Sequence, residues 1–400
     1  MKKILIVYAT AGEGHKRAAL ALKDAMGALN PSDVQVQTVD SLDYTNKFFK
    51  WFYPNCYIFM VTRIPTIWGL FYYMLDFKWL YPLTSLVRRI INKANTGRFE
   101  KFIREYNPDL VISTHFLAGE VISSLKRRRA IKTWLITCVT DFRMHSFWYS
   151  GQTDMFCAGF AETKSDLTRK WKVAPDRVHV TGIPIHGKFY AIKNKYEICG
   201  RRGLEKDLFT VLITGGGFGV GPIIGLVKNI VELGLRIQVL IVCGHNKKLL
   251  DEISALTTNN QQGRSLPSPA AGKQRRAKPP QGGLTTILKP FGFIDYVDEL
   301  MEVSDLGITK AGGLICSESV AKGLPLIIIA PIPGQESRNC RMLLKNRAAF
   351  KIKRPRELKK IISTVYRNTE ILKEMRVSIR SVKMENPAMH IAKFVLKVVK

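Results

Sequence analysis

Residues 306–336 read LGITKAGGLICSESVAKGLPLIIIAPIPGQE, and the order of apolar runs and turns in this stretch decides the fold. An apolar run at 306–309 enters the turn at Gly312 and Gly313, a stretch of helical character follows, and a second apolar run at 326–330 ends in another turn. A strand, a helix and a strand in this order are typical of a parallel sheet in an α/β protein.

The same alternation continues along the chain and divides it into two domains. Apolar runs typical of strands occur at 4–9, 109–114, 133–140, 155–158, 208–214, 238–243, 285–288, 306–309 and 326–330. We expect an N-terminal domain at 1–192, a linker at 193–207, a C-terminal domain at 208–385, and a helix at 386–400 that packs back on the N-terminal domain. Two doubly wound, Rossmann-like domains bind ligands at the carboxyl ends of their strands, so we expect the active site in the cleft between them.

Composition limits the classes of protein that the chain can represent. It has 400 residues and a formal net charge of +30, from 62 Lys and Arg against 32 Asp and Glu. Such a basic surface attracts nucleic acid, anionic lipid or phosphorylated metabolites. The seven cysteines have no metal-ligand spacing, which argues against a disulfide framework or structural zinc. The N-terminal apolar run enters a glycine turn, so we expect a first strand in a cytoplasmic protein and not a secretion signal.

Two segments depart from the strand–helix pattern. Residues 48–91 combine many aromatic side chains with lysines and arginines. Arg63 and Pro65 argue against a membrane span, because a central arginine costs about 2.5–3.5 kcal/mol. We expect a segment that lies in the membrane interface, with an ordinary helical hairpin packed on the sheet as the alternative. Residues 257–283 have almost no large apolar side chains and predict a disordered surface insertion.

A glycine-rich turn follows the first predicted strand and carries a histidine. Gly12 and Gly14 let the chain turn sharply at the start of a helix, whose free N–H groups favour anionic or hydroxyl partners. His15 is a candidate general base for a hydroxyl acceptor, because a histidine can take a proton at neutral pH. A helix-capping histidine in a plain strand–helix turn is the alternative.

A second glycine cluster, at 215–221, follows the strand at 208–214 and can hold a diphosphate on its backbone amides. A nicotinamide or flavin enzyme is the competing interpretation. The cluster does not match the GxGxxG motif cleanly. The next strand ends at 243–246, where no acidic residue is present to bind a ribose. We therefore favour a different nucleotide ligand.

The opening stretch holds the most specific pattern of candidate ligand contacts. Gly312 and Gly313 expose amides at a helix start to a diphosphate, and Glu318 can accept both hydroxyls of a ribose. Gln335 and Glu336 follow the next strand, where they can reach sugar hydroxyls. These features together predict a nucleotide-sugar site.

Motifs in both halves of the chain carry a family resemblance. They are Lys310-x-Gly-Gly-x-x-x-x-Glu318, Pro-x-Pro-Gly-Gln-Glu at 331–336, Gly292-Phe293-Ile294-Asp295, residues 10–19, residues 139–142 with His145 and Trp148, and residues 182–189. They resemble glycosyltransferase family 28, which has the GT-B fold, and within it the branch of diacylglycerol glycosyltransferases and monogalactosyldiacylglycerol synthases. The sequence departs from the family at Ala311, where proline is usual, at residues 11–13 and at Phe116.

The resemblance implies a role for each matched residue. His15 would be the general base, and an N-terminal acceptor domain would contribute Asp141, His145 and His115. The donor would be bound by Gly217, Phe293, Ile294, Lys310, Gly312, Gly313, Glu318, Gln335, Glu336 and Asn339.

The implied activity is inverting transfer of a hexose from a UDP-sugar to the free hydroxyl of diacylglycerol. The expected partners are a UDP-sugar, diacylglycerol or a related lipid, and the anionic inner face of the cell membrane, with the protein bound peripherally. We expect no nucleic-acid partner, because no recognisable binding motif accompanies the charge. We expect no cofactor and no metal, and magnesium is not required. A GT-B transferase with another lipid acceptor, such as a cell-wall lipid intermediate, and UDP-N-acetylglucosamine as donor stays open as the alternative.

Overall fold

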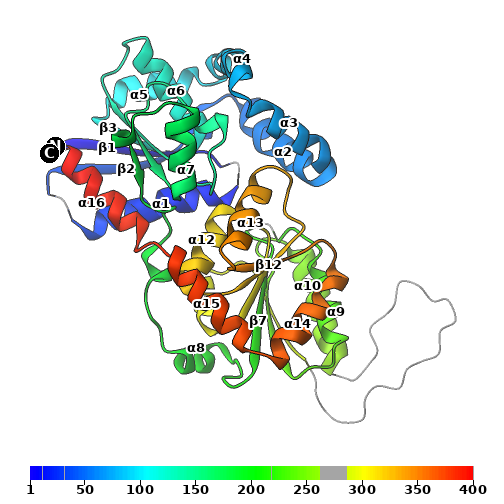
Figure 1. The fold of residues 1–400 in the computed structure, drawn as a ribbon. Helices are drawn as coiled ribbons and strands as arrows, with labels where there is room; N and C mark the ends of the chain where they lie inside the picture. Colours follow the sequence, from blue (N-terminus) through cyan, green and yellow to red (C-terminus); the bar gives the residue numbers. More distant parts are fainter. Residues whose placement is uncertain (11, 31, 218, 262–285, 400) are drawn as a thin grey trace.

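A computed structural model describes residues 1–10, 12–30, 32–217, 219–261 and 286–399. The described residues form two α/β domains, each built on a six-stranded parallel sheet (Figure 1). The doubly wound α/β architecture predicted from the sequence is confirmed.

The N-terminal domain is built on the first sheet. Its strands are β1 (Lys2–Tyr8), β2 (Val34–Asp40), β3 (Leu110–Ser113), β4 (Trp134–Cys138), β5 (Met155–Ala158) and β6 (Val178–Val180), in the order β2-β1-β3-β4-β5-β6. Its helices are α1 (Glu13–Ala28), α2 (Lys47–Arg63), α3 (Pro65–Leu75), α4 (Tyr81–Asn95), α5 (Gly97–Tyr106), α6 (Phe116–Arg127) and α7 (Ala161–Ser165). Strand β1 alternates its buried side chains between two cores, one under α1 and one under α5 and α6.

The C-terminal domain repeats this plan. Its strands are β7 (Phe209–Thr214), β8 (Ile237–Val242), β9 (Ile287–Phe291), β10 (Leu306–Thr309), β11 (Leu326–Ile329) and β12 (Ala349–Ile352), in the order β12-β11-β10-β7-β8-β9. Its helices are α9 (Ile223–Val231), α10 (Lys247–Gln261), α11 (Val297–Val303), α12 (Gly313–Lys322), α13 (Gln335–Lys345), α14 (Leu358–Arg367) and α15 (Glu370–Val382). Helices α9, α10 and α14 cover one face, α11, α12 and α13 cover the other, and α15 contributes side chains to both cores.

Two segments connect the domains. Helix α8 (Lys195–Arg202) occupies much of the predicted linker, and its Ile198 and Cys199 are buried in the core of the C-terminal domain. Helix α16 (Pro387–Val399) returns to the N-terminal domain and packs against α1 (Figure 1). Its Ile391 and Val395 are fully buried there, so the end of the chain contributes to the first core.

The aromatic and basic segment at 48–91 forms α2, α3, a short 3-10 turn (Lys78–Leu80) and most of α4. Most of the large apolar side chains that are exposed lie in this segment. In the described part of the chain, no single helix is long and apolar enough to cross a membrane. Helices α2 and α3 meet that criterion only as a pair, and they are bent by 115° at their junction.

The predicted insertion at 257–283 needs one correction. Helix α10 continues to Gln261, so the first five residues of that range are helical. The remaining residues, 262–283, lie outside the described part of the chain.

Candidate active site

The carboxyl ends of the two sheets border a cavity of about 610 Å³. Its walls come from the turns after β1, β4, β7, β10 and β11 and from helices α2 and α3. It brings together the predicted site residues His15, His115, Asp141, His145, Gly217, Phe293, Ile294, Lys310, Gly312, Gly313, Glu318, Gln335 and Glu336.

His15 lies in the first turn of α1, and its two ring nitrogens have different surroundings. Its Nδ1 is 2.8 Å from the carbonyl oxygen of Thr114 and 3.1 Å from the hydroxyl oxygen of Thr140. A carbonyl oxygen only accepts hydrogen bonds, so Nδ1 carries the proton and Nε2 holds the free lone pair. Burial lowers the pKa of His15 to about 4, which keeps the ring neutral and able to accept a proton at pH 7.

The other two predicted site histidines, His115 and His145, form hydrogen bonds with backbone groups. Nδ1 of His115 accepts from the N–H of Leu117 at 3.1 Å and caps α6. Nδ1 of His145 accepts from the N–H of Phe147 at 3.2 Å, and its Nε2 donates to the carbonyl oxygen of Tyr72 at 2.8 Å. Both rings line the cavity, but neither nitrogen of His145 is free for an acceptor substrate. His145 thus lines the cavity with its ring, while both of its nitrogens bond to backbone groups of the N-terminal domain.

Asp141 is a buried carboxylate between the two domains. It accepts a hydrogen bond from Trp148 Nε1 at 2.8 Å and another from the amide of Gln335, which belongs to the C-terminal domain. Burial raises the pKa of Asp141 to about 6, against the opposing effect of these two donors. Asp141 thus joins the predicted acceptor side to the predicted donor side.

Helix α12 begins at the cavity with backbone amides that have no partner within the helix. Gly312 is its N-cap, and no side chain among the described residues caps the first turn. A Cβ added to Gly313 would lie 2.2 Å from the carbonyl oxygen of Thr140, so glycine is required for this close approach of the domains. Glu318 follows in the second turn, only 3% exposed, and burial raises its pKa.

The glycine cluster after β7 lies against the turn after β8. The N–H of His245 donates to the carbonyl oxygen of Gly217 at 2.9 Å, and a Cβ on Gly244 would lie 2.3 Å from the same oxygen. A Cβ on Gly217 would also come within 2.7 Å of Cγ of Glu13, in the N-terminal domain. Gly217 therefore lies where segments of both domains meet.

Phe293 and Ile294 border the cavity after β9. The ring of Phe293 stacks on that of His245, with centroids 4.1 Å apart and planes inclined by 13°. Phe293 is 48% exposed, which leaves an aromatic surface on which a nucleotide base can stack.

The turn after β11 carries Gln335 and Glu336. The carboxylate of Glu336 accepts from the N–H of Ile332 at 2.9 Å. Burial raises the pKa of Glu336, and the nearby Lys310 ammonium opposes this shift. Lys310 thus brings a positive charge to the part of the cavity that Glu336 occupies.

Asn339 is the one predicted site residue outside the cavity wall, and it is fully buried. Its amide nitrogen donates to the carbonyl oxygen of Ala311 at 2.9 Å, and its amide oxygen accepts from the N–H of Phe142 at 3.1 Å. Asn339 therefore links the two domains, which corrects the expectation that it faces the donor sugar or phosphate.

Sequence reasoning missed the contacts of α3 with the turn after β11 and with helix α13. Arg338 Nη2 lies 2.6 Å from Asp76 Oδ2, and its guanidinium lies over the ring of Tyr72 at 5.1 Å. A Cβ on Gly334 would come within 2.6 Å of the same ring. No local pattern connects positions 76 and 338, which are 262 residues apart. The one sequence feature that indicates this close approach is Gly334, the glycine of the Pro-x-Pro-Gly motif.

One wall of the cavity is apolar. Its side chains come from α2, α3 and the turns after β3 and β4, and they include Phe52, Tyr53, Tyr57, Met60, Trp68, Phe116, Phe147 and Trp148. The ring of His15 lies 6.0 Å from that of Trp148. His15 therefore lies between this apolar wall and the glycine-rich turns. Among the described residues, no group of three or more His, Cys, Asp or Glu side chains is arranged to hold a metal ion.

Known proteins are similar to this chain in fold and in sequence. The crystal structure of MurG from Acinetobacter baumannii is similar over 99% of this chain and 100% of that one, with a TM-score of 0.58 at 14% identity. Residues 15–185 match the family model for monogalactosyldiacylglycerol (MGDG) synthase, and residues 210–385 match that for the glycosyltransferase family 28 C-terminal domain.

Two processive diacylglycerol beta-glucosyltransferases are similar over almost the whole chain. The protein from Bacillus licheniformis is 27% identical in an alignment 396 positions long, which covers 96% of this chain and 92% of the relative. The protein from Bacillus subtilis strain 168 is 26% identical in an alignment 406 positions long, which covers 99% of this chain and 95% of the relative.

Two doubly wound domains around a shared cavity, together with these matches, define a glycosyltransferase of the GT-B class. In this chain an MGDG synthase domain at residues 15–185 precedes a glycosyltransferase family 28 C-terminal domain at residues 210–385. The protein is a diacylglycerol hexosyltransferase-like enzyme.

Proposed function

We propose that this enzyme transfers a hexose from a UDP-sugar to the free hydroxyl of diacylglycerol with inversion of the anomeric centre. The observation that carries the proposal is His15: a neutral ring with a free Nε2, in a cavity that joins an apolar wall to the uncapped start of α12. A lipid hydroxyl arrives along the apolar wall, and the nucleotide lies on the glycine-rich side.

In the proposed reaction, the acceptor oxygen attacks the anomeric carbon as its proton passes to Nε2 of His15. The bond between that carbon and the leaving diphosphate oxygen breaks in the same displacement. The amides at Gly312 and Gly313, the positive end of α12 and the ammonium of Lys310 stabilise the negative charge on the diphosphate.

The remaining donor contacts follow from the residues around the cavity. Glu318 accepts hydrogen bonds from the ribose hydroxyls, and Phe293 with Ile294 borders the base. Gly217 contributes backbone contacts to the diphosphate. Gln335 and Glu336 face the donor sugar, although Gln335 also donates to Asp141.

We further propose that the enzyme acts as a peripheral protein on the anionic inner face of the cell membrane. The exposed aromatic and aliphatic side chains at 48–91 support this, because they belong to the helices whose other side chains form the apolar cavity wall. Lysines in the segment meet anionic headgroups while rings enter the interface.

The donor site is tested by calorimetry with UDP. Glu318→Ala removes the acceptor of the ribose hydroxyls, so UDP and UDP-sugar affinity should fall together by about 1–3 kcal/mol, the cost of losing a charged hydrogen-bond partner. Lys23→Gln, on the exposed side of α1, is the control and should bind UDP normally. Unchanged UDP affinity in Glu318→Ala would contradict the assigned donor site.

A further inference from the structure

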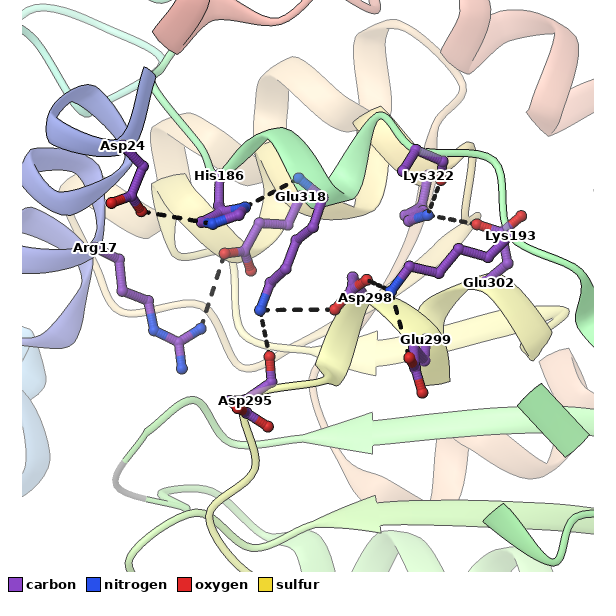
Figure 2. Close-up of polar contacts among 12 residues, drawn as sticks. Arg17, Asp24, His186, Lys193, Asp295, Asp298, Glu299, Glu302, Glu318 and Lys322 are labelled. Atoms are coloured by element: carbon purple, nitrogen blue, oxygen red, sulfur yellow. Dashed lines mark hydrogen bonds and ion pairs between the residues drawn. The ribbon is translucent and has the colours of Figure 1, made fainter. Parts of the chain in front are cut away.

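Arg17 extends from the N-terminal domain to the proposed ribose-binding carboxylate of the C-terminal domain. It lies two residues after His15 on α1, and its Nη1 is 3.8 Å from Oε1 of Glu318 (Figure 2). Gly14, in the same turn of α1, faces Leu314 of α12, since a Cβ there would lie 3.8 Å from Leu314 Cδ1. The first turns of the two helices therefore lie against each other at the cavity.

The surroundings of Glu318 are unusual for a buried carboxylate. In the described part of the chain its oxygens accept no hydrogen bond, and Arg17 is its one ion-pair partner. Glu318 lines the cavity, so hydroxyls of a ligand there can supply the hydrogen-bond donors that a carboxylate with so little exposure normally has.

Other charged groups near Glu318 are engaged elsewhere. Lys188 donates to the carbonyl oxygen of Asp295 and lies 3.7 Å from Asp298 Oδ1. Asp298 is also paired with Lys193 at 2.6 Å (Figure 2). Burial raises the pKa of Glu318; the cations of Arg17 and Lys188 oppose that shift, and the carboxylate of Asp298 adds to it. Arg17 opposes the shift more than Lys188 does, and among the described residues it is the one within ion-pair distance of Glu318.

We propose that Arg17 is a positioning residue of the donor site, which holds the Glu318 carboxylate in the orientation that accepts the ribose hydroxyls of a nucleoside diphosphate. The proposal rests on the ribose contact of Glu318 described under the proposed function. Through Arg17, the N-terminal domain contributes to the nucleotide site. Because α1 carries both Arg17 and His15, a bound nucleotide also fixes the helix that bears the base.

The test is calorimetry with UDP across a pH series on wild type, Arg17→Gln, Arg17→Lys and Lys23→Gln. Glu318 accepts hydrogen bonds when it is ionised, and loss of the Arg17 cation raises its pKa further. Arg17→Gln should therefore bind UDP about two- to fivefold more weakly at neutral pH, the range for a partly exposed ion pair. Its affinity should also begin to fall at a higher pH than that of wild type as the solution is acidified. Arg17→Lys should restore most of both properties, and Lys23→Gln should match wild type.

A double-variant comparison separates a positioning role from direct contact with the nucleotide. If Arg17 acts through Glu318, Arg17→Gln/Glu318→Ala should bind UDP as Glu318→Ala does. Additive losses would overturn the proposal, because they would place Arg17 on the nucleotide itself. Wild-type affinity and pH dependence in Arg17→Gln would also overturn it while leaving the proposed donor site intact. Wild-type UDP affinity in Glu318→Ala would instead remove the donor site and this inference together.

Discussion

His15 lines the cavity, and its Nδ1 already has a hydrogen-bond partner within the protein. The carbonyl oxygen of Thr114 fixes the proton on Nδ1, and the hydroxyl of Thr114 donates back to the carbonyl oxygen of His15 at 2.9 Å. This pair of contacts sets both the tautomer and the orientation of the ring, as a general base requires.

Replacement of His15 tests that assignment. His15→Ala should lower the transfer rate by about 10²–10⁴-fold, the usual worth of a positioned base, and leave UDP affinity close to wild type. Because the pKa of His15 is lowered to about 4, the ring is neutral above that pH and gains a proton as the pH falls through it. The ratio of wild-type to variant rates should therefore be constant above about pH 5, one unit higher, and should shrink below it. A variant with near-normal turnover would exclude His15 as the base.

Residues differ in how far their place in the site can be predicted from the sequence. His15, Gly312, Gly313 and Glu318 were predicted to share a site because glycine turns at the carboxyl ends of parallel strands face one cleft. The hydrogen-bond partners of Asn339 could not be predicted, because they are distant from it in the sequence. Its amide oxygen is occupied by the N–H of a residue 197 positions away, which no spacing rule reveals.

At the scale of elements, helices α2, α3 and α4 carry the proposed membrane contact. The structure refines which side chains are available for it. Tyr72 is buried, and Arg88 pairs with Glu120 at 3.2 Å. Lys50 is paired with Asp43 at 2.7 Å. The exposed aromatic or aliphatic side chains and the lysines without an acidic partner in the described part of the chain are the better candidates.

The membrane contact is tested by vesicle sedimentation across a salt series. Lys47, Lys78 and Lys93 replaced by Ser should weaken binding to anionic vesicles, since each surface cation contributes about 1 kcal/mol that salt screens. Trp51, Leu70 and Trp79 replaced by Ser should remove the binding that persists at high salt, because apolar burial is not screened. Both variants should bind UDP normally.

Trp134→Ser is the matched control for these substitutions. Trp134 is an exposed tryptophan of β4 in the same domain, but it lies outside the segment from α2 to α4 that holds the tested residues. It should bind vesicles as wild type does. Wild-type binding in both test variants, or a loss in Trp134→Ser equal to theirs, would place the membrane surface elsewhere.

Strands with continuous apolar runs were predicted close to their observed positions, whereas strands β2, β6 and β12 and helix α8 were not predicted. Strand β2 alternates valine with glutamine, and β12 is only four residues long, so neither gave an apolar run. Helix α8 was read as linker because its sequence is highly polar. Arg201 and Arg202 pair with Glu299 of α11, and this tertiary contact holds a helix that local composition does not favour.

At the scale of the whole molecule, close contacts across the cavity hold the two domains together. Gly313 approaches Thr140, Gly334 approaches Tyr72, and Asn339 and Arg338 bond to backbone atoms of the N-terminal domain. The donor-side turns and the apolar wall thereby form one site. The matches to family models show the class of enzyme, whereas the choice of sugar depends on hydroxyl contacts that neither composition nor spacing determines.

The most direct measurement is mass spectrometry of the lipids formed when the enzyme meets diacylglycerol vesicles with UDP-glucose, UDP-galactose or UDP-N-acetylglucosamine in turn. We predict a hexosyl-diacylglycerol with at least one UDP-hexose, with the anomeric configuration opposite to that of the donor when the product is examined by NMR. No glycolipid from any of these donors, together with transfer of N-acetylglucosamine to a cell-wall lipid intermediate, would contradict the proposed acceptor.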